Sequence, residues 1–371
     1  MGKKKVSIIT IIDAINVGSY LQAYALSHVV ESNKCVCEIV DYRRRRNALR
    51  TVLKRSFKNM ALFKALLYFA YWCYVTIRQR PKLLGFLKKH IAVTERKYHS
   101  YEELCAYTPV ADIYITGSDQ VWNSGYNDGV DEAFYLSYVP VGKRKIAYAA
   151  SIGNNEFAEL ERRHISSLLA SFDYISVRED SAFYALKDIG ITNVDHVLDP
   201  TLLINKEKWD MVSSTAKFKK TEPYLLVYSV ESNKKKFVGD YANRVAKRLN
   251  LKIYVISASG LASMTGKYDR KFVMISPEIF IKLFLNADYI VVSSFHGTAF
   301  SINFSKQFTT IAPEKYDTRV RSLLNLFNLE RRLYLPSNES EYEIDIDYVK
   351  VSSILSDKRE ESLKYVNRIL Q

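Results

Sequence analysis

The first 42 residues alternate strand, turn, helix and strand, and this order constrains the fold more than any other feature. Residues 6–12 (VSIITII) are a continuous apolar run typical of a buried strand, and residues 16–19 (NVGS) predict a turn. Residues 20–32 repeat apolar side chains every three or four positions, which predicts a helix, before a second strand at 35–42. A β-α-β opening favours a parallel sheet with crossover helices.

The same strand-to-turn pattern recurs along the chain, which has 371 residues, about twice a typical domain. It returns four times before residue 205, and a second set of strands and helices begins at residue 224. Residues 205–223 are interpreted as a linker. We therefore predict two Rossmann-like α/β domains that face each other across a cleft. The expected parts are an N-terminal domain (1–205), a C-terminal domain (206–340), and a tail and helix (341–371) that pack back on the N-terminal domain.

Composition excludes several classes of protein. The four cysteines show neither zinc-ligand spacing nor a CxxC pair, and no clustered Asp/His set indicates a metal. The N-terminal apolar run is short and is interrupted by Asp13 and Asn16, so a signal peptide is not indicated and we expect a cytoplasmic protein. Tyrosine occurs 27 times, which suits surfaces that contact sugars or lipid headgroups.

A basic helical insertion at 43–100 carries much of the net charge of +14. Residues 43–89 contain 14 Lys and Arg and no Asp or Glu. Within them, residues 65–77 are uncharged but too few to span a bilayer, which needs ~20 apolar residues. An in-plane helix on an anionic membrane surface is one interpretation, and a helical hairpin packed on its own domain is the other. RNA binding is not indicated, because no RNP-like aromatic pattern is present.

A histidine interrupts the corner between a strand and a helix at residues 293–301 (SSFHGTAFS). His296 would lie at a helix N-terminus, which attracts anions, and Gly297 would let backbone approach a ligand. A bound dianion would raise the pKa of the imidazole and make it a proton donor. The alternative is a capping or core histidine.

Polar residues also follow a strand at residues 115–123 (ITGSDQVWN). Gly117 permits a tight turn, and Asp119 and Gln120 offer acceptors and donors that suit sugar hydroxyls. Ser118 lies between Gly117 and Asp119, and Trp122 could stack on a pyranose ring. Alternatively, Asp119 caps a short helix and Trp122 fills the core.

Three further strand ends carry polar residues. Arg178 could hold a carboxylate or phosphate in a bidentate way, or pair at the surface with Glu179 or Asp180. Asp199 before Pro200 is most simply a helix cap. The first turn lacks GxGxxG spacing, but it could contact an anion or a sugar acceptor through Asn16, Gly18, Ser19 and Gln22.

Five motifs in this order resemble the polysaccharide pyruvyl transferase family, over most of residues 5–335: NVGSYLQAYAL, GSDQVWN, ISVRED, VLDPTLLI and SSFHGTAFS. The resemblance implies a two-domain GT-B-like fold and transfer of pyruvate from phosphoenolpyruvate, a co-substrate, onto two sugar hydroxyls as a ketal. By motif, His296 would bind the donor and supply acid, and Arg178 would hold the donor. Asp119 is our candidate base for the acceptor. Ser294, Gly297, Thr298 and Lys306 complete the expected donor site.

One position departs from the family pattern. Many members have Arg-Leu-His where this chain has Ser294, Phe295 and His296, so Lys306, Arg319 or Arg321 would have to replace the arginine. The implied acceptor is a sugar of an exopolysaccharide or capsule, carried on a polyprenyl lipid at the inner membrane face, where residues 43–89 would hold the enzyme. A nucleotide-sugar glycosyltransferase of the same architecture is the alternative, and a non-catalytic membrane or nucleic-acid binder is a second.

Overall fold

The computed structural model describes residues 2–45, 48–229, 235–257, 268–312, 317–334 and 345–371. The chain forms two compact units. Unit 1 comprises Met1–Thr76, Leu84–Leu203 and Lys358–Gln371, and unit 2 comprises Ile77–Leu83 and Ile204–Asp357. The predicted boundary lay two residues later, between residues 205 and 206.

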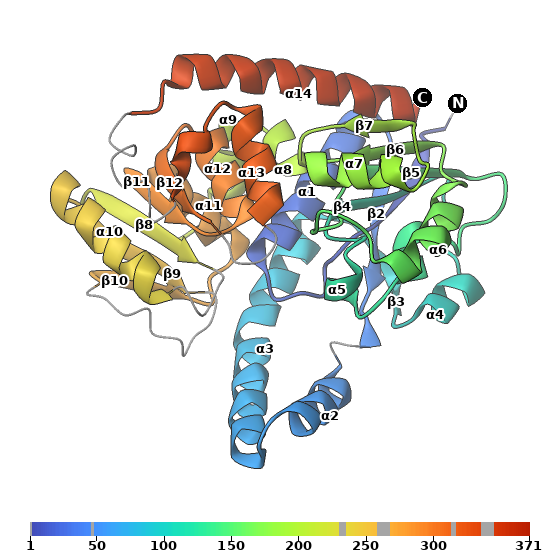
Figure 1. The fold of residues 1–371 in the computed structure, drawn as a ribbon, viewed down its shortest axis with the longest axis horizontal. Coiled ribbons are helices and arrows are strands. Elements are labelled where there is room, and N and C mark those ends of the chain that lie inside the picture. Colours follow the sequence, from blue (N-terminus) through green and yellow to red (C-terminus); the bar gives the residue numbers. More distant parts are fainter. Residues whose placement is uncertain (1, 46–47, 230–234, 258–267, 313–316, 335–344) are drawn as a thin grey trace. The chain divides into compact units, whose positions relative to one another are not determined.

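Unit 1 is built on a seven-stranded parallel sheet in the order β3-β2-β1-β4-β5-β6-β7 (Figure 1). Its strands are β1 (Lys5–Ile9), β2 (Val36–Tyr42), β3 (Val93–Tyr98), β4 (Ile113–Asp119), β5 (Arg144–Ala150), β6 (Tyr174–Val177) and β7 (Val194–His196). The central strands are buried along their length because both faces are covered, which explains their continuous apolar runs. The predicted β-α-β opening is confirmed.

Helices lie between successive strands of this sheet, as parallel connections require. They are α1 (Val17–Ser32), α2 (Leu49–Asn59), α3 (Leu62–His90), α4 (Tyr101–Ala106), α5 (Ser124–Asn127), the 3₁₀ helix η2 (Glu132–Tyr135), α6 (Glu159–Leu169), α7 (Asp180–Asp188) and α8 (Pro200–Leu203). Asn16 caps α1 by accepting a hydrogen bond from the Gly18 N–H (2.9 Å), which fixes where the first helix begins.

Unit 2 contains a six-stranded parallel sheet in the order β10-β9-β8-β11-β12-β13. Its strands are β8 (Tyr224–Ser229), β9 (Lys252–Ser257), β10 (Arg270–Val273), β11 (Tyr289–Val292), β12 (Gln307–Ile311) and β13 (Leu333–Tyr334). Its helices are α9 (Lys206–Val212), α10 (Lys235–Leu249), α11 (Pro277–Asn286), α12 (Phe295–Asn303), α13 (Asp317–Leu326) and the 3₁₀ helix η3 (Glu330–Arg332). The second α/β unit predicted from the sequence is therefore confirmed.

Part of the predicted linker is helical. Residues 205–223 begin with α9, which Asn205 caps by accepting a hydrogen bond from the Lys208 N–H (3.0 Å). Trp209 of this helix is fully buried, and its ring packs edge-on against Phe300 at 5.2 Å between centroids. The linker prediction was wrong here because a single buried tryptophan, and no long apolar period, holds the helix to the unit.

Tyrosines fill the cores of both units. Four of the largest fully buried side chains of unit 1 are tyrosines, and Tyr224 and Tyr254 stack in unit 2 with ring centroids 4.3 Å apart. Several of the hydroxyls donate to backbone carbonyls; that of Tyr224, for example, donates to the Leu283 carbonyl (2.6 Å). The abundance of tyrosine thus reflects aromatic core packing at many positions, which corrects the surface interpretation.

The last helix, α14 (Tyr348–Leu370), contributes its C-terminal part to unit 1. There the Ser362 hydroxyl accepts a hydrogen bond from the Leu198 N–H (3.0 Å), and Arg359 donates to the Leu202 carbonyl (2.7 Å). Val366, Ile369 and Leu370 are buried, so this segment completes the core of the unit.

Candidate active site

Both sheets reverse their strand order at one point, and ligands of open α/β sheets bind beyond the carboxyl ends of the strands at that point. In unit 1, β1 pairs with both β2 and β4. In unit 2, β8 pairs with both β9 and β11. The predicted site residues fall mostly in the segments that follow these strands.

A buried ionic cluster lies at the carboxyl edge of the first sheet. Arg178, directly after β6, donates to Asp199 Oδ2 (2.6 Å) and to Asp119 Oδ1 (3.1 Å). Its Nε lies 3.6 Å from Glu179 Oε2. Burial disfavours the charge of the Arg178 guanidinium, but Asp199, Asp119 and Glu179 outweigh it and raise its pKa.

This environment changes the role of Arg178. Its side chain has 0% exposed area, and its guanidinium is engaged by three carboxylates of its own unit. The alternative of a surface pair is wrong, because Arg178 and Glu179 are both buried. A donor-holding guanidinium is not what these contacts favour either. We instead describe Arg178 as a residue that positions Asp119.

Hydroxyl groups complete the cluster. Ser118 Oγ donates to Asp199 Oδ2 (3.1 Å), and Ser151 Oγ donates to Glu179 Oε1 (2.7 Å). Asp199 also accepts from the Thr201 N–H (3.0 Å), so the predicted cap of α8 is confirmed, and the same carboxylate binds Arg178. The buried charges are therefore paired and hydrogen-bonded, as stability requires.

Asp119 ends β4 in the left-handed backbone region, with φ 77°. Its Oδ2 accepts a hydrogen bond from Ser19 Oγ (2.8 Å), which links the end of β4 to the first turn of α1. Gly117 stands where φ is 111° and an added Cβ would lie 2.2 Å from the Tyr148 carbonyl oxygen, so only glycine fits there. Gly117 lies within β4, so the tight turn predicted at this residue is wrong; the chain turns at Val121 and Trp122, after the strand ends.

The first turn of α1 joins the same cluster. Gln22 donates through Nε2 to Thr10 Oγ1 (2.8 Å), and Thr10 in turn donates to the Ser118 carbonyl (2.9 Å). Gln22, Ser19 and Gly18 are buried. The structure thus brings the predicted residues of the first turn together with Ser118 and Asp119.

Trp122 lies differently from the prediction, and the role of Gln120 stays a prediction. Trp122 is 1% exposed, stacks on Tyr135 (5.7 Å between centroids) and donates to the Phe134 carbonyl (3.2 Å). A ring enclosed in this way cannot stack on a sugar, so the core interpretation holds and the sugar-stacking role is withdrawn. Gln120 Oε1 accepts a hydrogen bond from Asn123 (2.7 Å) and is partly exposed.

In unit 2, the predicted corner between strand and helix is confirmed. β11 ends at Val292, and Ser294 caps α12 by accepting from the Gly297 N–H (3.2 Å). His296 is the second residue of the helix and is 7% exposed. Beside it, Ser293 and Ser229, at the ends of β11 and β8, are joined through their hydroxyls (2.8 Å). His296 therefore lies at the switch point of the second sheet.

Gly297 and Thr298 contribute packing. A Cβ added at Gly297 would lie 2.8 Å from Val292 Cγ1, so glycine lets the helix start close to its strand. The Thr298 hydroxyl donates to the Ser294 carbonyl (3.0 Å) and pairs with that of Thr310 (3.0 Å). Thr298 is fully buried, which contradicts direct donor contact.

Lys306 lies at the wrong edge of the sheet for a donor ligand. It precedes β12, whose first residue, Gln307, pairs with Tyr289 at the start of β11, whereas His296 follows the end of β11. Its ammonium donates to the Ala287 carbonyl (2.9 Å), and burial lowers its pKa to about 8. Lys306 therefore cannot replace the family arginine. Arg321 pairs with Asp317 (2.7 Å), and Arg319 lies in the first turn of α13, at the same edge as His296.

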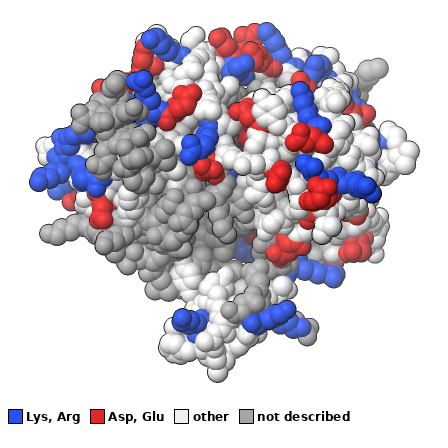
Figure 2. Space-filling view, in the orientation of Figure 1, with Lys and Arg blue, Asp and Glu red and all other residues white. Residues whose placement is uncertain are grey.

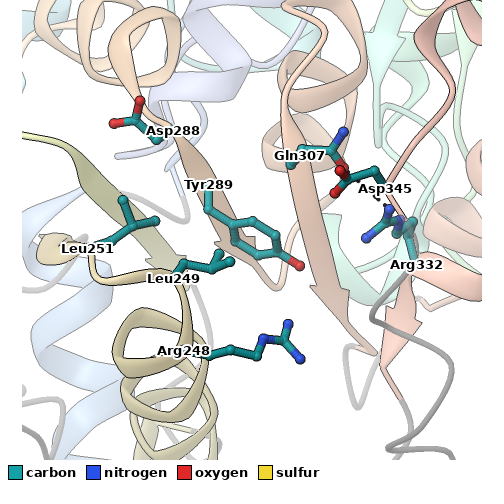
Figure 3. Close-up of a pocket in the computed structure, with 8 residues that line it drawn as sticks. All are labelled: Arg248, Leu249, Leu251, Asp288, Tyr289, Gln307, Arg332 and Asp345. Atoms are coloured by element: carbon teal, nitrogen blue, oxygen red, sulfur yellow. Dashed lines mark hydrogen bonds between the residues drawn. The ribbon is translucent and has the colours of Figure 1, made fainter.

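A cavity of about 460 Å³ occurs at the opposite edge of the second sheet (Figure 3). It lies where β11 and β12 begin, and it is lined by Arg248, Leu249, Leu251, Asp288, Tyr289, Gln307, Arg332 and Asp345. This is the amino edge of a parallel sheet, not the edge where ligands of such sheets bind. The cavity therefore does not form part of the candidate active site.

The comparisons with known proteins agree with this architecture. A family model described as polysaccharide pyruvyl transferase matches residues 16–315. The chain belongs to the polysaccharide pyruvyl transferase family. No curated protein sequence matches it significantly. The family match covers α1, the cluster around Asp119 and Arg178, and the corner at His296.

Solved structures show the same fold at low identity. A UDP-GlcNAc 2-epimerase of Methanocaldococcus jannaschii in complex with UDP-GlcNAc and UDP has a TM-score of 0.55 and 12% identity, with 99% of each chain covered. The S. aureus MnaA–UDP co-structure has a TM-score of 0.50 and 10% identity, covering 97% of this chain and 90% of that chain. The N-terminal domain of Candida albicans trehalose-6-phosphate phosphatase has a TM-score of 0.50 and 9% identity. The predicted GT-B-like fold class is confirmed.

Sequence reasoning missed four members of the first cluster as site residues: Thr10, Ser151, Glu179 and Asp199. Each follows the end of a strand, or begins the helix after it, so position after a strand was a signal that could have found them. Some of their partners lie far away in the chain: Arg178 and Asp199 are 21 residues apart, and Thr10 and Ser118 are 108 residues apart.

Proposed function

We propose that this member of the family transfers the enolpyruvyl group of phosphoenolpyruvate onto two hydroxyls of one sugar, forming a cyclic pyruvate ketal and releasing phosphate. The observation that carries the proposal is the family match over residues 16–315. The position of His296 at the switch point of the second sheet supports it, because a proton donor at a helix N-terminus suits an anionic enol phosphate.

The proposed chemistry balances without a further reactant. A proton adds to the methylene carbon of phosphoenolpyruvate, and the neighbouring carbon becomes an oxocarbenium-like centre that one sugar hydroxyl attacks. The C–O bond to phosphate then breaks, and the second hydroxyl closes the ring. Of the two hydroxyl protons, one replaces the proton used at the methyl group and the other leaves with phosphate. No cofactor is required by this scheme.

The residues have separate roles in the proposal. His296, as the imidazolium, supplies the proton to the methylene carbon, and the positive end of the α12 dipole favours the anionic donor. Asp119 is the candidate base for the acceptor. Both of its oxygens accept hydrogen bonds from its own unit, so an acceptor hydroxyl would share Oδ2 with Ser19, which the lone pairs of a carboxylate allow.

The acceptor in this proposal is a sugar of an exopolysaccharide or capsule precursor on a polyprenyl lipid. Such a precursor is presented at the inner face of a membrane, so the enzyme would work as a peripheral protein on the cytoplasmic side. Within the described residues, no helix combines the length and apolarity that a membrane crossing needs.

The reaction can be tested with purified full-length protein, phosphoenolpyruvate and a panel of polyprenyl-linked sugars that carry adjacent diols. We expect phosphate release that depends on the sugar and a matching gain of mass on the glycan. Phosphoenolpyruvate should also raise the melting temperature more than UDP, GDP or CMP sugars do. Stabilisation by a nucleotide sugar with transfer of its glycosyl group would contradict the proposal in favour of a glycosyltransferase.

A further inference from the structure

Exposed apolar side chains are concentrated on one part of the molecule. Of the eighteen large hydrophobic residues that are exposed in the described chain, nine lie between Phe57 and Ile77, on α2, on the first half of α3 and on the connection between the two helices. We call these nine side chains the hairpin surface. A concentration of exposed apolar side chains of this kind indicates a contact site.

The hairpin surface follows from helical periodicity. Val52 and Ala65 are buried, so one side of each helix faces protein. Phe63, Leu66 and Leu67 recur at intervals of three and four, which places them on one face of α3, and they are 72%, 50% and 55% exposed. The two helices therefore have one side against protein and leave an apolar face uncovered, and contact of this face with a membrane stays a prediction.

The C-terminal part of α3 anchors the hairpin to unit 1. Phe86 is buried and its ring meets Tyr24 of α1 edge-on, with centroids 5.8 Å apart, while His90 contacts the same tyrosine (5.7 Å). In Figure 1, α2 and the N-terminal part of α3 extend away from the sheet of unit 1. The apolar face is thus carried on a helix whose C-terminal part packs against α1 of unit 1.

The charges around the hairpin surface are all of one sign. Lys54, Lys58 and Lys64 are exposed on the same two helices, and residues 43–89 contain no Asp or Glu. Figure 2 shows blue and no red side chains on this part of the molecule. Arg43 and Arg44 do not belong to this surface, because they are buried and paired with Asp41 and Asp13.

We propose that the hairpin surface docks on a membrane that contains anionic lipid. Aromatic and aliphatic side chains would enter the headgroup and acyl boundary, and the lysines would meet negative headgroups, as in other in-plane helices. A second copy of the chain fits less well, since pairing two such surfaces would bring lysines together with no carboxylate on either hairpin. The proposal names the partner of the proposed enzyme, and lipid binding itself does not depend on the reaction.

The test is flotation of the full-length protein with vesicles of phosphatidylcholine alone and with added phosphatidylglycerol. We expect binding to the anionic vesicles that weakens at high salt. Replacing Phe63, Leu66 and Leu67 by Ser should reduce binding at least about tenfold. Replacing Lys54, Lys58 and Lys64 by Gln should lower it about fivefold per lysine on anionic vesicles, with little effect on neutral ones.

The matched control carries three serines at exposed apolar positions outside the hairpin, Val110, Leu160 and Tyr184, and should bind like the original protein. Circular dichroism and melting temperature check that each variant is folded. Equal flotation of the hairpin and control variants would overturn the proposal. So would a dimer that the three hairpin serines split while no vesicle binding is seen. Phosphate release from phosphoenolpyruvate with a lipid-free sugar separates failure of docking from failure of the proposed reaction.

Discussion

At the scale of single residues, the buried ionic cluster around Arg178 positions Asp119. One guanidinium touches three carboxylates from the ends of three structural segments, and each carboxylate also accepts a hydrogen bond from a serine or threonine hydroxyl. Removing one partner of a buried ionic group leaves uncompensated charge, which costs far more than the pair contributes.

Replacing Arg178 by Met should therefore lower the free energy of unfolding by about 3–5 kcal/mol, because Asp119, Asp199 and Glu179 lose their shared cation. Urea unfolding followed by circular dichroism measures the change. Arg162→Met serves as the control, since this residue is partly exposed and pairs with the exposed Glu159, so its replacement should change stability by less than about 1 kcal/mol. Equal, small effects of the two substitutions would contradict the structural role of Arg178.

The end of β4 offers a second prediction at this scale. Gly117→Ala should destabilise the protein by more than Gly129→Ala, although both glycines have positive φ, 111° and 117°. The added Cβ would meet the Tyr148 carbonyl oxygen at 2.2 Å in the first case and no atom within 4 Å in the second. We expect about 1 kcal/mol for Gly129→Ala and at least twice that for Gly117→Ala. Equal losses in thermal unfolding would show that the backbone of β4 ends elsewhere.

At this scale the sequence indicated where residues lie relative to the strands, but it did not indicate which side chains they contact. Asp119, Arg178 and His296 could be placed at strand ends because an apolar run stops just before each of them. Burial of Trp122 and enclosure of Arg178 could not be foreseen, because their partners come from other segments. Arg178 and Asp119, for example, are 59 residues apart.

At the scale of elements, helices and strands could be predicted where the apolar residues repeat clearly and turn residues mark the ends. They could not be predicted where the repeat is weak. The strand and the helix at the start of the chain were predicted because an apolar run and a helical period follow one another there. The turn predicted over residues 16–19 was wrong in part, because α1 begins at Val17 and Asn16 is its N-cap. Helix α9 was missed because seven residues are too few to show a helical repeat of apolar side chains. The burial of Trp209, which holds the helix, depends on Phe300, and that contact is not visible in the sequence. Lys306 was misplaced because a helix separates it from His296 and returns the chain to the other edge of the sheet.

The position of Lys306 predicts a pH effect. Burial lowers its pKa to about 8, below the value near 10.5 expected in the unfolded chain. The cost of burying the charge is fully present below pH 8 and is relieved as the pH rises toward 10.5, where the unfolded chain binds more protons. The stability gap between Lys306→Met and the original protein should therefore shift in favour of the original by about 1–2 kcal/mol over this range, allowing for solvent screening. A gap that stays constant in urea unfolding from pH 7 to 10 would contradict this.

At the scale of the whole molecule, fold and function have different sources of evidence. The two parallel-sheet units are shared with proteins that are 9–12% identical to this chain, so the fold alone does not select a substrate. The family match supplies the reaction class, and the residues at the switch points supply the candidate chemistry. The sequence already contained both kinds of evidence: five motifs in order indicated the family, and the alternation of strands and helices indicated the fold.

Our main proposal is that the methylene carbon of phosphoenolpyruvate is protonated during transfer, with His296 as the acid. Its most direct test is to run the reaction with phosphoenolpyruvate and a lipid-linked diol sugar in D₂O and to analyse the ketal by mass spectrometry. We expect one deuterium in the methyl group of each ketal. We also expect turnover at least about 10²-fold lower in His296→Asn, with normal turnover in the surface control His164→Asn. A ketal without deuterium, or full activity in His296→Asn, would contradict the proposal.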